Sequence, residues 1–211
     1  MKICIINGSP KANNSTSELL IGYLMPFIKE NEIITYRISK RDFSEIQFSQ
    51  IQNSEALIFA FPLYIDSIDS HLLRFLLELE KRGFENKNIS VYCIINNGFY
   101  EGRQNQTAAD IMKNWCEAVG LTYGQTLGVG AGEMLPFLKD IPLGHGPNKN
   151  IGIAFQKLSR NILSLSQGKD LFVSPNWPRF LWKIQSSLDF WYPQAKKNGL
   201  KRKELKDRIN Y

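Results

Sequence analysis

The sequence predicts an α/β fold in which helices cover both faces of a parallel sheet. Apolar runs alternate with amphipathic stretches along roughly the first 165 residues, which is typical of strands joined by crossover helices. The first apolar run, Lys2–Asn7, is nearly continuous, as in a strand buried on both faces. With 211 residues, 43% of them hydrophobic and 22% charged, the chain is long enough for one well-buried core.

Five strands and four longer helices follow from this patterning. The predicted strands are Lys2–Asn7, Ile33–Ile38, Ala56–Phe61, Ile89–Asn96 and Thr122–Leu127. The predicted helices are Ser15–Glu30, which Pro26 kinks or shortens, Ser67–Arg82, Gln106–Val119 and Ile151–Ser166. Residues 39 to 55 form a polar connection, in which the segment Gln50–Ser54 can be helical. We expect the five parallel strands in the order 2-1-3-4-5.

A small, hydroxyl-rich loop separates the first strand from the first helix. Gly8 and Pro10 end the strand, and Ser15, Thr16 and Ser17 are typical residues for the start of a helix. The free N–H groups of a first helical turn carry the positive end of the helix dipole and attract an anion. The loop lacks the Gly-Lys-Ser/Thr end of a P-loop and the three-glycine spacing of a dinucleotide-binding turn, which disfavours nucleoside triphosphates and classical NAD binding.

Two interpretations of this loop stay open from the residues alone. In the first, it is an ordinary capped helix after an ordinary strand. In the second, Ser9, Ser15, Thr16 and Ser17 donate hydrogen bonds to phosphate oxygens, and Lys11 adds positive charge at the rim.

Composition limits the other classes of function. No apolar run is long enough to cross a membrane and the N-terminus is a core strand, so we expect no membrane span and a cytoplasmic protein. Cys4 and Cys93 lie inside predicted strands and Cys116 lies inside a predicted helix, and the sequence has no Cys-x-x-Cys pair. We therefore expect buried free thiols and neither disulfides nor metal ligands. His71 and His145 are isolated, so we expect no metal site and assign neither histidine a catalytic role.

The net charge of +6 is the most informative number in the composition. Much of the basic excess lies in Lys196–Lys203, which we interpret as a solvated tail, so we expect no nucleic-acid partner. The other use of a basic surface is to attract anionic small molecules, such as a phosphorylated nicotinamide cofactor.

Three unusual loops meet at the predicted carboxyl edge of the sheet. They begin at Gly8, Phe61 and Asn96, and ligands of open α/β sheets bind at this edge, where the strand order reverses. The first loop suits a phosphate. The other two offer Tyr64 and a Gly98-Phe99-Tyr100 turn, which suit a planar heterocycle. A phosphate joined to a flat polar ring describes FMN.

These same segments resemble a known family. Asn7–Lys11 with Ser15-Thr16, the Pro62-Leu63-Tyr64 turn and the turn Asn97–Glu101 are similar to the NADPH-dependent FMN reductase-like branch of the flavodoxin-like superfamily, over about residues 1 to 165. The resemblance implies a flavodoxin-like three-layer sandwich. Many relatives have Gly-Asn-Thr where this chain has Asn14-Ser15-Thr16, and the compact cysteine cluster of the related iron-sulfur flavoproteins is absent from the sequence.

The resemblance also implies which residues hold the cofactor. The phosphate and ribityl end is assigned to Ser9, Lys11, Ser15, Thr16 and Ser17. The isoalloxazine ring is assigned to Pro62, Leu63, Tyr64 and Ile65 on one side and to Asn97, Gly98, Phe99 and Tyr100 at its other edge.

The activity expected from this resemblance is an FMN-dependent NAD(P)H oxidoreductase. NADPH or NADH gives a hydride to FMN N5, and electrons then pass to a small-molecule acceptor that the sequence leaves open, such as a flavin or a quinone. No catalytic side chain is assigned. The alternative is a flavodoxin-like electron carrier without a nicotinamide site of its own, although such carriers are usually acidic and this chain has a pI near 9.2. A third alternative, a flavin-free α/β domain that regulates or binds nucleic acid, depends on the basic tail.

We expect two parts in the chain. Residues 1–168 form the flavodoxin-like FMN-binding domain, and residues 169–211 form an aromatic and basic C-terminal extension with helical segments. Trp177, Phe180, Trp182, Phe190 and Trp191 require a covering surface, either their own domain or a partner subunit. We expect a homodimer.

Overall fold

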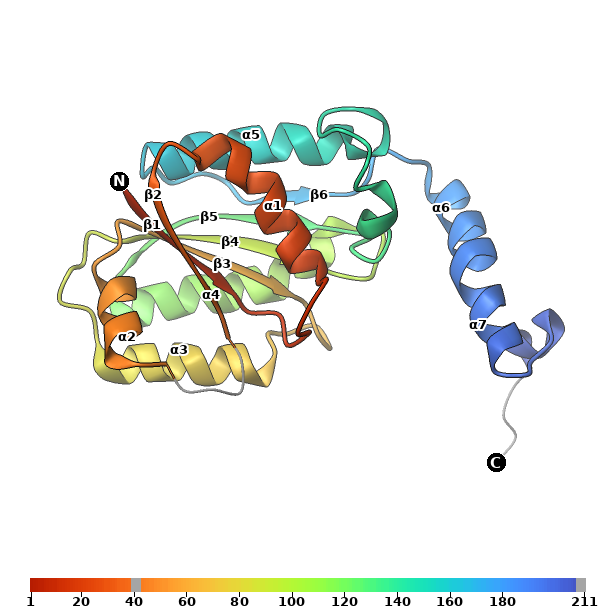
Figure 1. The fold of residues 1–211 in the computed structure, drawn as a ribbon, viewed down its shortest axis with the longest axis horizontal. Coiled ribbons are helices and arrows are strands. Elements are labelled where there is room, and N and C mark those ends of the chain that lie inside the picture. Colours follow the sequence, from red (N-terminus) through yellow and green to blue (C-terminus); the bar gives the residue numbers. More distant parts are fainter. Residues whose placement is uncertain (39–42, 208–211) are drawn as a thin grey trace. The chain divides into compact units, whose positions relative to one another are not determined.

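The computed structural model describes residues 1–38 and 43–207, and it divides into two compact units, Met1–Pro175 and Asn176–Tyr211. The first unit contains a sheet with helices on both faces (Figure 1). This is the predicted α/β architecture. The division falls after residue 175, so residues 169–175, expected in the C-terminal extension, belong to the first unit.

The sheet has six parallel strands, so the prediction of five was wrong. The strands are β1 (Lys2–Asn7), β2 (Glu32–Arg37), β3 (Ala56–Pro62), β4 (Ser90–Asn96), β5 (Thr122–Val129) and β6 (Leu171–Val173). Their order is β2-β1-β3-β4-β5-β6, which extends the expected order 2-1-3-4-5 by one edge strand. All neighbouring pairs are parallel.

The sixth strand is short, and its position depends on contacts that the sequence pattern does not contain. The Asp170 carboxylate accepts hydrogen bonds from the Thr126 backbone N–H at 2.7 Å and from the Tyr123 hydroxyl at 2.8 Å. The Phe172 ring lies against Gly128, where a Cβ atom would be 2.6 Å from the ring. These contacts hold β6 against β5 although β6 has only three residues.

The described residues form seven α-helices, of which α1 to α5 belong to the first unit and lie on the two faces of its sheet (Figure 1), while α6 and α7 belong to the C-terminal unit. The helices are α1 (Thr16–Ile28), α2 (Glu45–Gln52), α3 (Ser70–Arg82), α4 (Gln106–Val119), α5 (Lys149–Leu163), α6 (Arg179–Ser186) and α7 (Tyr192–Lys197). Apolar residues of α1 and α5 pack with one face of the sheet, and those of α2, α3 and α4 pack with the other. The core of the first unit therefore has two layers, one on each side of the strands.

The helix ends follow from local chemistry. The Ser15 hydroxyl caps α1, and Asp69 caps α3 by accepting from the backbone N–H groups of His71 and Leu72. Helix α4 ends at Gly120, whose positive φ of 71° suits glycine. Pro26 lies inside the last turn of α1, and the helix ends at Ile28, two residues before the predicted end.

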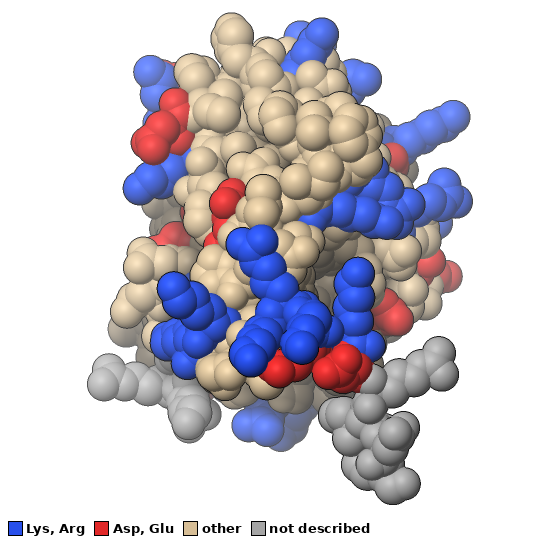
Figure 2. Space-filling view, turned by 90° about the vertical axis from the view of Figure 1, so that its right-hand side faces the viewer, with Lys and Arg blue, Asp and Glu red and all other residues tan. Residues whose placement is uncertain are grey.

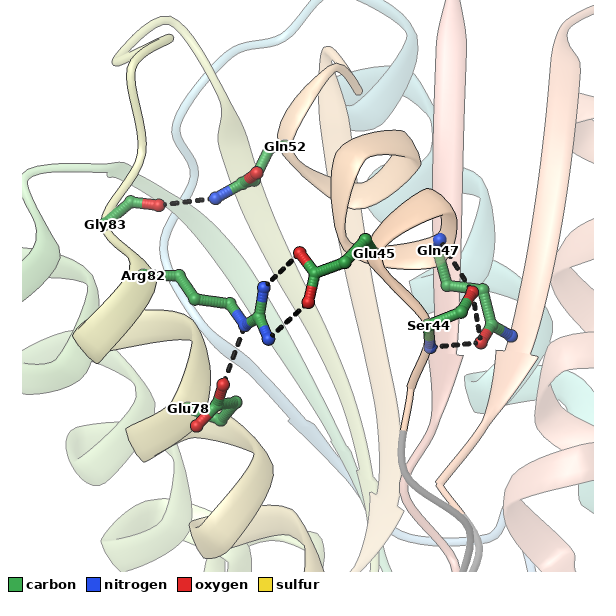
Figure 3. A network of polar contacts seen from close by, with 7 residues as sticks. All are labelled: Ser44, Glu45, Gln47, Gln52, Glu78, Arg82 and Gly83. Carbon is green, nitrogen blue, oxygen red and sulfur yellow. Dashed lines mark hydrogen bonds and ion pairs between the residues drawn. The ribbon is translucent and has the colours of Figure 1, made fainter.

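Helix α2 is longer and begins earlier than the predicted segment Gln50–Ser54. Ser44 and Gln47 form a capping box at its start, a pair whose spacing in the sequence signals a helix N-terminus (Figure 3). Part of the expected connection, residues 39–42, lies outside the described residues.

An exposed ion-pair network joins α2 to α3 (Figure 3). The Arg82 guanidinium donates to both Glu45 carboxylate oxygens, at 2.7 and 3.0 Å, and to Glu78 at 2.7 Å. The hydrogen bond with Arg82 lowers the pKa of Glu45. This network links α2 and α3, which pack on the side of the sheet opposite α1.

The three cysteines are buried free thiols, as predicted. None of the helices in the described part of the chain combines the length and the apolar character needed to cross a membrane. Within residues 1–38 and 43–207, no group of three or more His, Cys, Asp or Glu side chains is arranged to hold a metal ion.

Candidate functional site

The carboxyl ends of the strands form one edge of the sheet. Asn7 of β1 is paired with Arg37 of β2 and with Ala60 of β3, and Asn96 of β4 is paired with Pro62 of β3 and with Val129 of β5. The loops after β1, β3 and β4 leave from this edge. The site residues predicted from the sequence lie in these three loops or in the first turn of α1, except Pro62, which is the last residue of β3.

The loop after β1 is shaped by hydrogen bonds within itself. The Ser9 N–H donates to Asn7 Oδ1 at 3.0 Å, and the Lys11 N–H donates to Ser9 Oγ at 3.3 Å. Asn14 has a positive φ of 53°, which turns the chain into the helix, and Ser15 Oγ accepts from the Glu18 N–H at 3.1 Å. Ser9 and Ser15 are buried and use their oxygens as acceptors, so their hydroxyl hydrogens can serve a ligand.

The backbone from residue 12 to residue 17 carries consecutive unbonded donors. The N–H groups of Ala12 through Ser17 donate no hydrogen bond to any residue within 1–38 and 43–207. The first N–H groups of a helix have no acceptor inside the helix, and here the preceding loop adds several more. This row of donors at the N-terminus of α1 can bind an anion.

Thr16 and Ser17 connect this loop to its neighbours. Thr16 Oγ1 donates to the Gly132 carbonyl oxygen at 3.1 Å, and Ser17 Oγ accepts from Asn96 Nδ2 at 3.0 Å. The structure therefore places both hydroxyl groups in contacts between loops. Their backbone N–H groups remain among the unbonded donors.

The loop after β5 belongs to the site, although none of its residues is in the predicted set. The Gly132 N–H donates to the Asn97 carbonyl oxygen at 2.7 Å, and the Ala131 N–H donates to the Phe99 carbonyl oxygen. A Cβ atom on Gly130 would lie 2.2 Å from the Tyr100 carbonyl oxygen. Glycine occupies every second position from 128 to 132, and this pattern is the sequence signal for the close approach of the two loops.

The loop after β3 ends in a tight two-residue turn. Tyr64 and Ser67 exchange backbone hydrogen bonds at 2.9 and 3.0 Å, and Ile65 and Asp66 between them have φ angles of 47° and 55°. Left-handed backbone is strained for a β-branched residue. The Ile65 side chain is 100% exposed, so no packing inside the protein compensates for this strain. Strained, exposed residues of this kind cluster at ligand sites.

The loop after β4 presents both polar and aromatic groups. Asn97 Nδ2 donates to the Glu101 carbonyl oxygen at 3.2 Å, and Asn97 Oδ1 is buried with no donor among the described residues. Phe99 is exposed, and the Tyr100 hydroxyl donates to the Pro175 carbonyl oxygen at 3.4 Å. The Leu63 N–H donates to the Asn96 carbonyl oxygen at 2.7 Å, which joins this loop to the one after β3.

Arg37 is a further residue of the site that sequence reasoning missed. Its guanidinium donates to the carbonyl oxygens of Lys11 and Ala12, and it forms an ion pair with Glu18 at 3.0 Å. It is the last residue of β2, the strand next to β1. Its place at the carboxyl edge is the signal that could have identified it.

No thiol is available at this edge for nucleophilic chemistry. Burial raises the pKa of Cys4 and of Cys116 to about 12, and it also raises the pKa of Cys93. Thiols that stay protonated at neutral pH are poor nucleophiles. The groups that this edge of the sheet offers to a ligand are therefore hydrogen-bond donors, aromatic rings and the loop backbone.

Comparisons with known proteins support the fold. No known family signature matches the sequence, and no curated protein matches it. Among solved structures, the chain is similar to a flavone reductase, with a TM-score of 0.59 and 9% identity over 80% of this chain and 66% of that one. It is similar to an NAD(P)H:quinone oxidoreductase from Methanothermobacter marburgensis, with a TM-score of 0.56 and 12% identity over 80% and 97% of the two chains. A short-chain flavodoxin associated with a bacterial microcompartment gives a TM-score of 0.54 and 9% identity over 79% and 99%. The sheet with helices on both faces therefore has the arrangement found in flavodoxin-like structures.

Proposed function

We propose that this chain is an FMN-dependent NAD(P)H oxidoreductase. The observation that carries the proposal is the row of N–H groups from Ala12 to Ser17 that have no acceptor among the described residues, together with two loops that carry exposed aromatic and apolar side chains. A phosphate suits the first feature and a flat ring suits the second. The similarity to a flavone reductase and to a quinone oxidoreductase agrees with this class of reaction.

The residues at the edge fit the two ends of FMN. The phosphate end is assigned to the backbone N–H groups of residues 12–17, with hydroxyl donors from Ser9 and Ser15 and positive charge from Lys11. The ring is assigned to the turn after β3 and the turn after β4. Its contacts are Pro62, Leu63, Tyr64, Ile65, Asn97, Gly98, Phe99 and Tyr100.

In this reaction the protein binds and orients groups. FMN, when bound, accepts hydride from reduced nicotinamide and passes electrons to a second acceptor. The exposed side chains of Tyr64, Ile65 and Phe99 shape the surface that the ring contacts and limit the access of water to it. Asn97 Oδ1, which accepts no hydrogen bond from the part of the chain that the structure describes, is an acceptor available to the ring. No side-chain acid or base is assigned to the hydride step.

Binding of FMN and reduction by nicotinamide test the proposal directly. The purified chain should bind FMN, and NADPH or NADH should bleach the flavin absorption under anaerobic conditions. A saturating concentration of FMN that gives no binding would refute the assignment. A steady-state screen of both nicotinamides with flavins, quinones and other acceptors then identifies the substrates.

The phosphate assignment has a matched pair of variants. Ser15 and Ser44 both cap a helix through the side-chain oxygen, but only Ser15 lies in the proposed phosphate loop. Ser15→Ala should lower the affinity for FMN by about tenfold, because it removes one hydrogen bond to a charged group. The affinity for riboflavin should stay unchanged. Ser44→Ala should lower stability to a similar extent without changing FMN affinity. Equal losses for FMN and riboflavin in Ser15→Ala would contradict the assignment.

A flavodoxin-like electron carrier is the second candidate, because a short-chain flavodoxin is among the similar structures. Such a carrier binds FMN but needs a separate reductase. Direct anaerobic reduction by NADPH or NADH separates the two functions, because only the oxidoreductase accepts hydride from nicotinamide without a partner.

A further inference from the structure

The C-terminal unit, Asn176–Tyr211, contains an apolar helix face that the described residues of the same unit do not bury. Its helical part runs from α6 through a π-helical turn, Ser187–Trp191, into α7 without a break. Neither α6 nor the π-helical turn has a buried residue. A helix with no buried position is not held by a core of its own, so its apolar side chains are available to something outside the unit.

These side chains form a stripe with helical spacing. Phe180, Ile184, Leu188 and Trp191 follow one another at intervals of four, four and three residues, which places them on one face of the helix. Their exposed fractions are 64%, 53%, 50% and 57%. We refer to these four residues as the apolar stripe. A contiguous exposed patch of this kind marks an interaction surface.

The charge of the molecule is concentrated in the same unit. Residues 176–211 contain 9 Lys or Arg and 3 Asp or Glu, while residues 1–175 contain 17 of each kind. The whole net charge of +6 therefore belongs to the C-terminal unit. Figure 2 shows a face of the molecule on which Lys and Arg side chains gather beside uncharged surface.

The basic residues lie next to the apolar stripe. Arg179 and Lys183 each precede a stripe residue on α6, and Lys196 and Lys197 follow the stripe at the end of α7. A second basic group occupies the 3-10 turn Arg202–Lys206 and the residue before it. Aliphatic and aromatic side chains on one face, with Lys and Arg along its sides, are typical of a helix that lies in the surface of an anionic membrane.

We propose that the C-terminal unit binds the surface of an anionic phospholipid bilayer. The apolar stripe enters the boundary between headgroups and acyl chains, and the lysines and arginines pair with lipid phosphates. The positive charge disfavours a second copy of the same helix as the partner, since like charges oppose association. The stripe disfavours nucleic acid, because a phosphate backbone gains nothing from exposed Phe, Ile and Leu side chains.

Vesicle flotation of the purified 211-residue chain tests this proposal. The protein should float with vesicles of phosphatidylcholine and phosphatidylglycerol, and binding to phosphatidylcholine alone should be weaker by roughly tenfold or more. High salt should release a large part of the bound protein. The fluorescence of the exposed Trp191 should shift to shorter wavelength on binding, because the indole leaves water.

Matched variants separate the stripe from general effects. Ile184→Ser with Leu188→Ser should reduce binding to the anionic vesicles by roughly tenfold, since two apolar side chains no longer enter the bilayer. Ile46→Ser with Phe137→Ser alters two exposed apolar side chains of the first unit and should leave binding unchanged. The stripe variants should keep their circular dichroism spectrum, because neither position is buried in the protein.

Charge variants complete the test. The double variant Lys201→Gln with Lys203→Gln should weaken binding to anionic vesicles and reduce the salt dependence of that binding. The control is Lys81→Gln with Lys113→Gln, two exposed lysines of the first unit, which should leave both the binding and its salt dependence unchanged. Absence of flotation, equal flotation with both vesicle types, or unchanged binding of the stripe variant would overturn the proposal. A dilution-resistant dimer that the stripe variant converts to monomer would also overturn it, because the stripe would then be an interface between two copies.

Discussion

Arg37 holds the candidate phosphate loop from a neighbouring strand. Its guanidinium contacts two loop carbonyl oxygens and pairs with Glu18 in the first turn of α1. These contacts turn carbonyl oxygens of the loop toward a cation, which leaves the N–H groups of the following residues free for an anion. The side chain is 29% exposed, so the ion pair itself is partly screened by water.

This arrangement predicts that Arg37→Gln weakens FMN binding. We expect the dissociation constant to rise by about tenfold, since the loop loses two charge-assisted hydrogen bonds that order it. Titration by flavin fluorescence measures the change. Arg160→Gln removes the same charge from an exposed position of α5 and should leave the affinity unchanged. An Arg37→Gln protein with the affinity of the original chain would show that the loop keeps its shape without this contact.

Individual residues of the site were predictable to different degrees. The N-cap role of Ser15 follows from its residue type and its place before an apolar helix, and the structure confirms it. The contact of Thr16 with Gly132 spans 116 residues, and no local pattern contains it. The left-handed backbone at Ile65 was unpredictable, because isoleucine is among the residues least suited to it.

At the scale of elements, the strands were easier to predict than the connections. The continuous apolar runs of β1, β3 and β4 identify buried parallel strands, and α4 begins and ends where its pattern predicts. The sixth strand was missed, because a segment as short as Leu171–Val173 has no periodicity of its own. It pairs with β5 through tertiary contacts, including those of Asp170.

Two glycines in different elements predict opposite effects of the same substitution. Gly130→Ala should lower the free energy of unfolding by about 1 to 3 kcal/mol, since the new Cβ would meet backbone atoms of Tyr100 and Gly102 at 2.2 and 2.6 Å. Gly22→Ala should raise it by about 0.5 to 1 kcal/mol, because Gly22 is exposed in the middle of α1 and nothing lies within 4 Å of its added Cβ.

Urea denaturation of both alanine variants measures these changes. A neutral Gly130→Ala substitution would mean that the loops after β4 and β5 can separate without loss of stability. A destabilising Gly22→Ala substitution would mean that position 22 is not the exposed and unobstructed helical position that the structure shows.

At the scale of the whole molecule, the two-layered core predicts a loss of stability at alkaline pH. Burial raises the pKa of Cys4 and Cys116 from 9.0 to about 12, and that of Tyr92 from 10.0 to about 12. In the unfolded chain these groups release protons at lower pH than in the folded protein. Their contribution to stability is therefore complete below about pH 9 and is lost as the pH rises toward 12.

Urea denaturation at a series of pH values checks this expectation. The free energy of unfolding should stay level between neutral pH and about pH 9 and then decrease. Cys116→Ala should reduce the slope above that pH, because one of the titrating groups is removed. A curve with the same alkaline slope in both proteins would show that the buried thiol does not contribute.

The general position of the site was predictable from topology, whereas its internal contacts were not. An open parallel sheet with the order 2-1-3-4-5 directs attention to the carboxyl ends of β1, β3 and β4, and the structure brings those loops together. The assignment of individual residues to FMN stays a prediction, as does the homodimer. The uncovered stripe on the C-terminal unit has a simple helical pattern, but only its exposure distinguishes it from a core-facing helix.

The hydrogen bonds between loops have a consequence for the thermodynamics of binding. Gly132 is bonded to Thr16 through its carbonyl oxygen and to Asn97 through its N–H, and Asn96 is bonded to Ser17 and to Leu63. These bonds connect the loops at the carboxyl edge to one another. A ligand that enters such a preorganised site loses little of its binding free energy to the ordering of loops, so its affinity reports the direct contacts it makes.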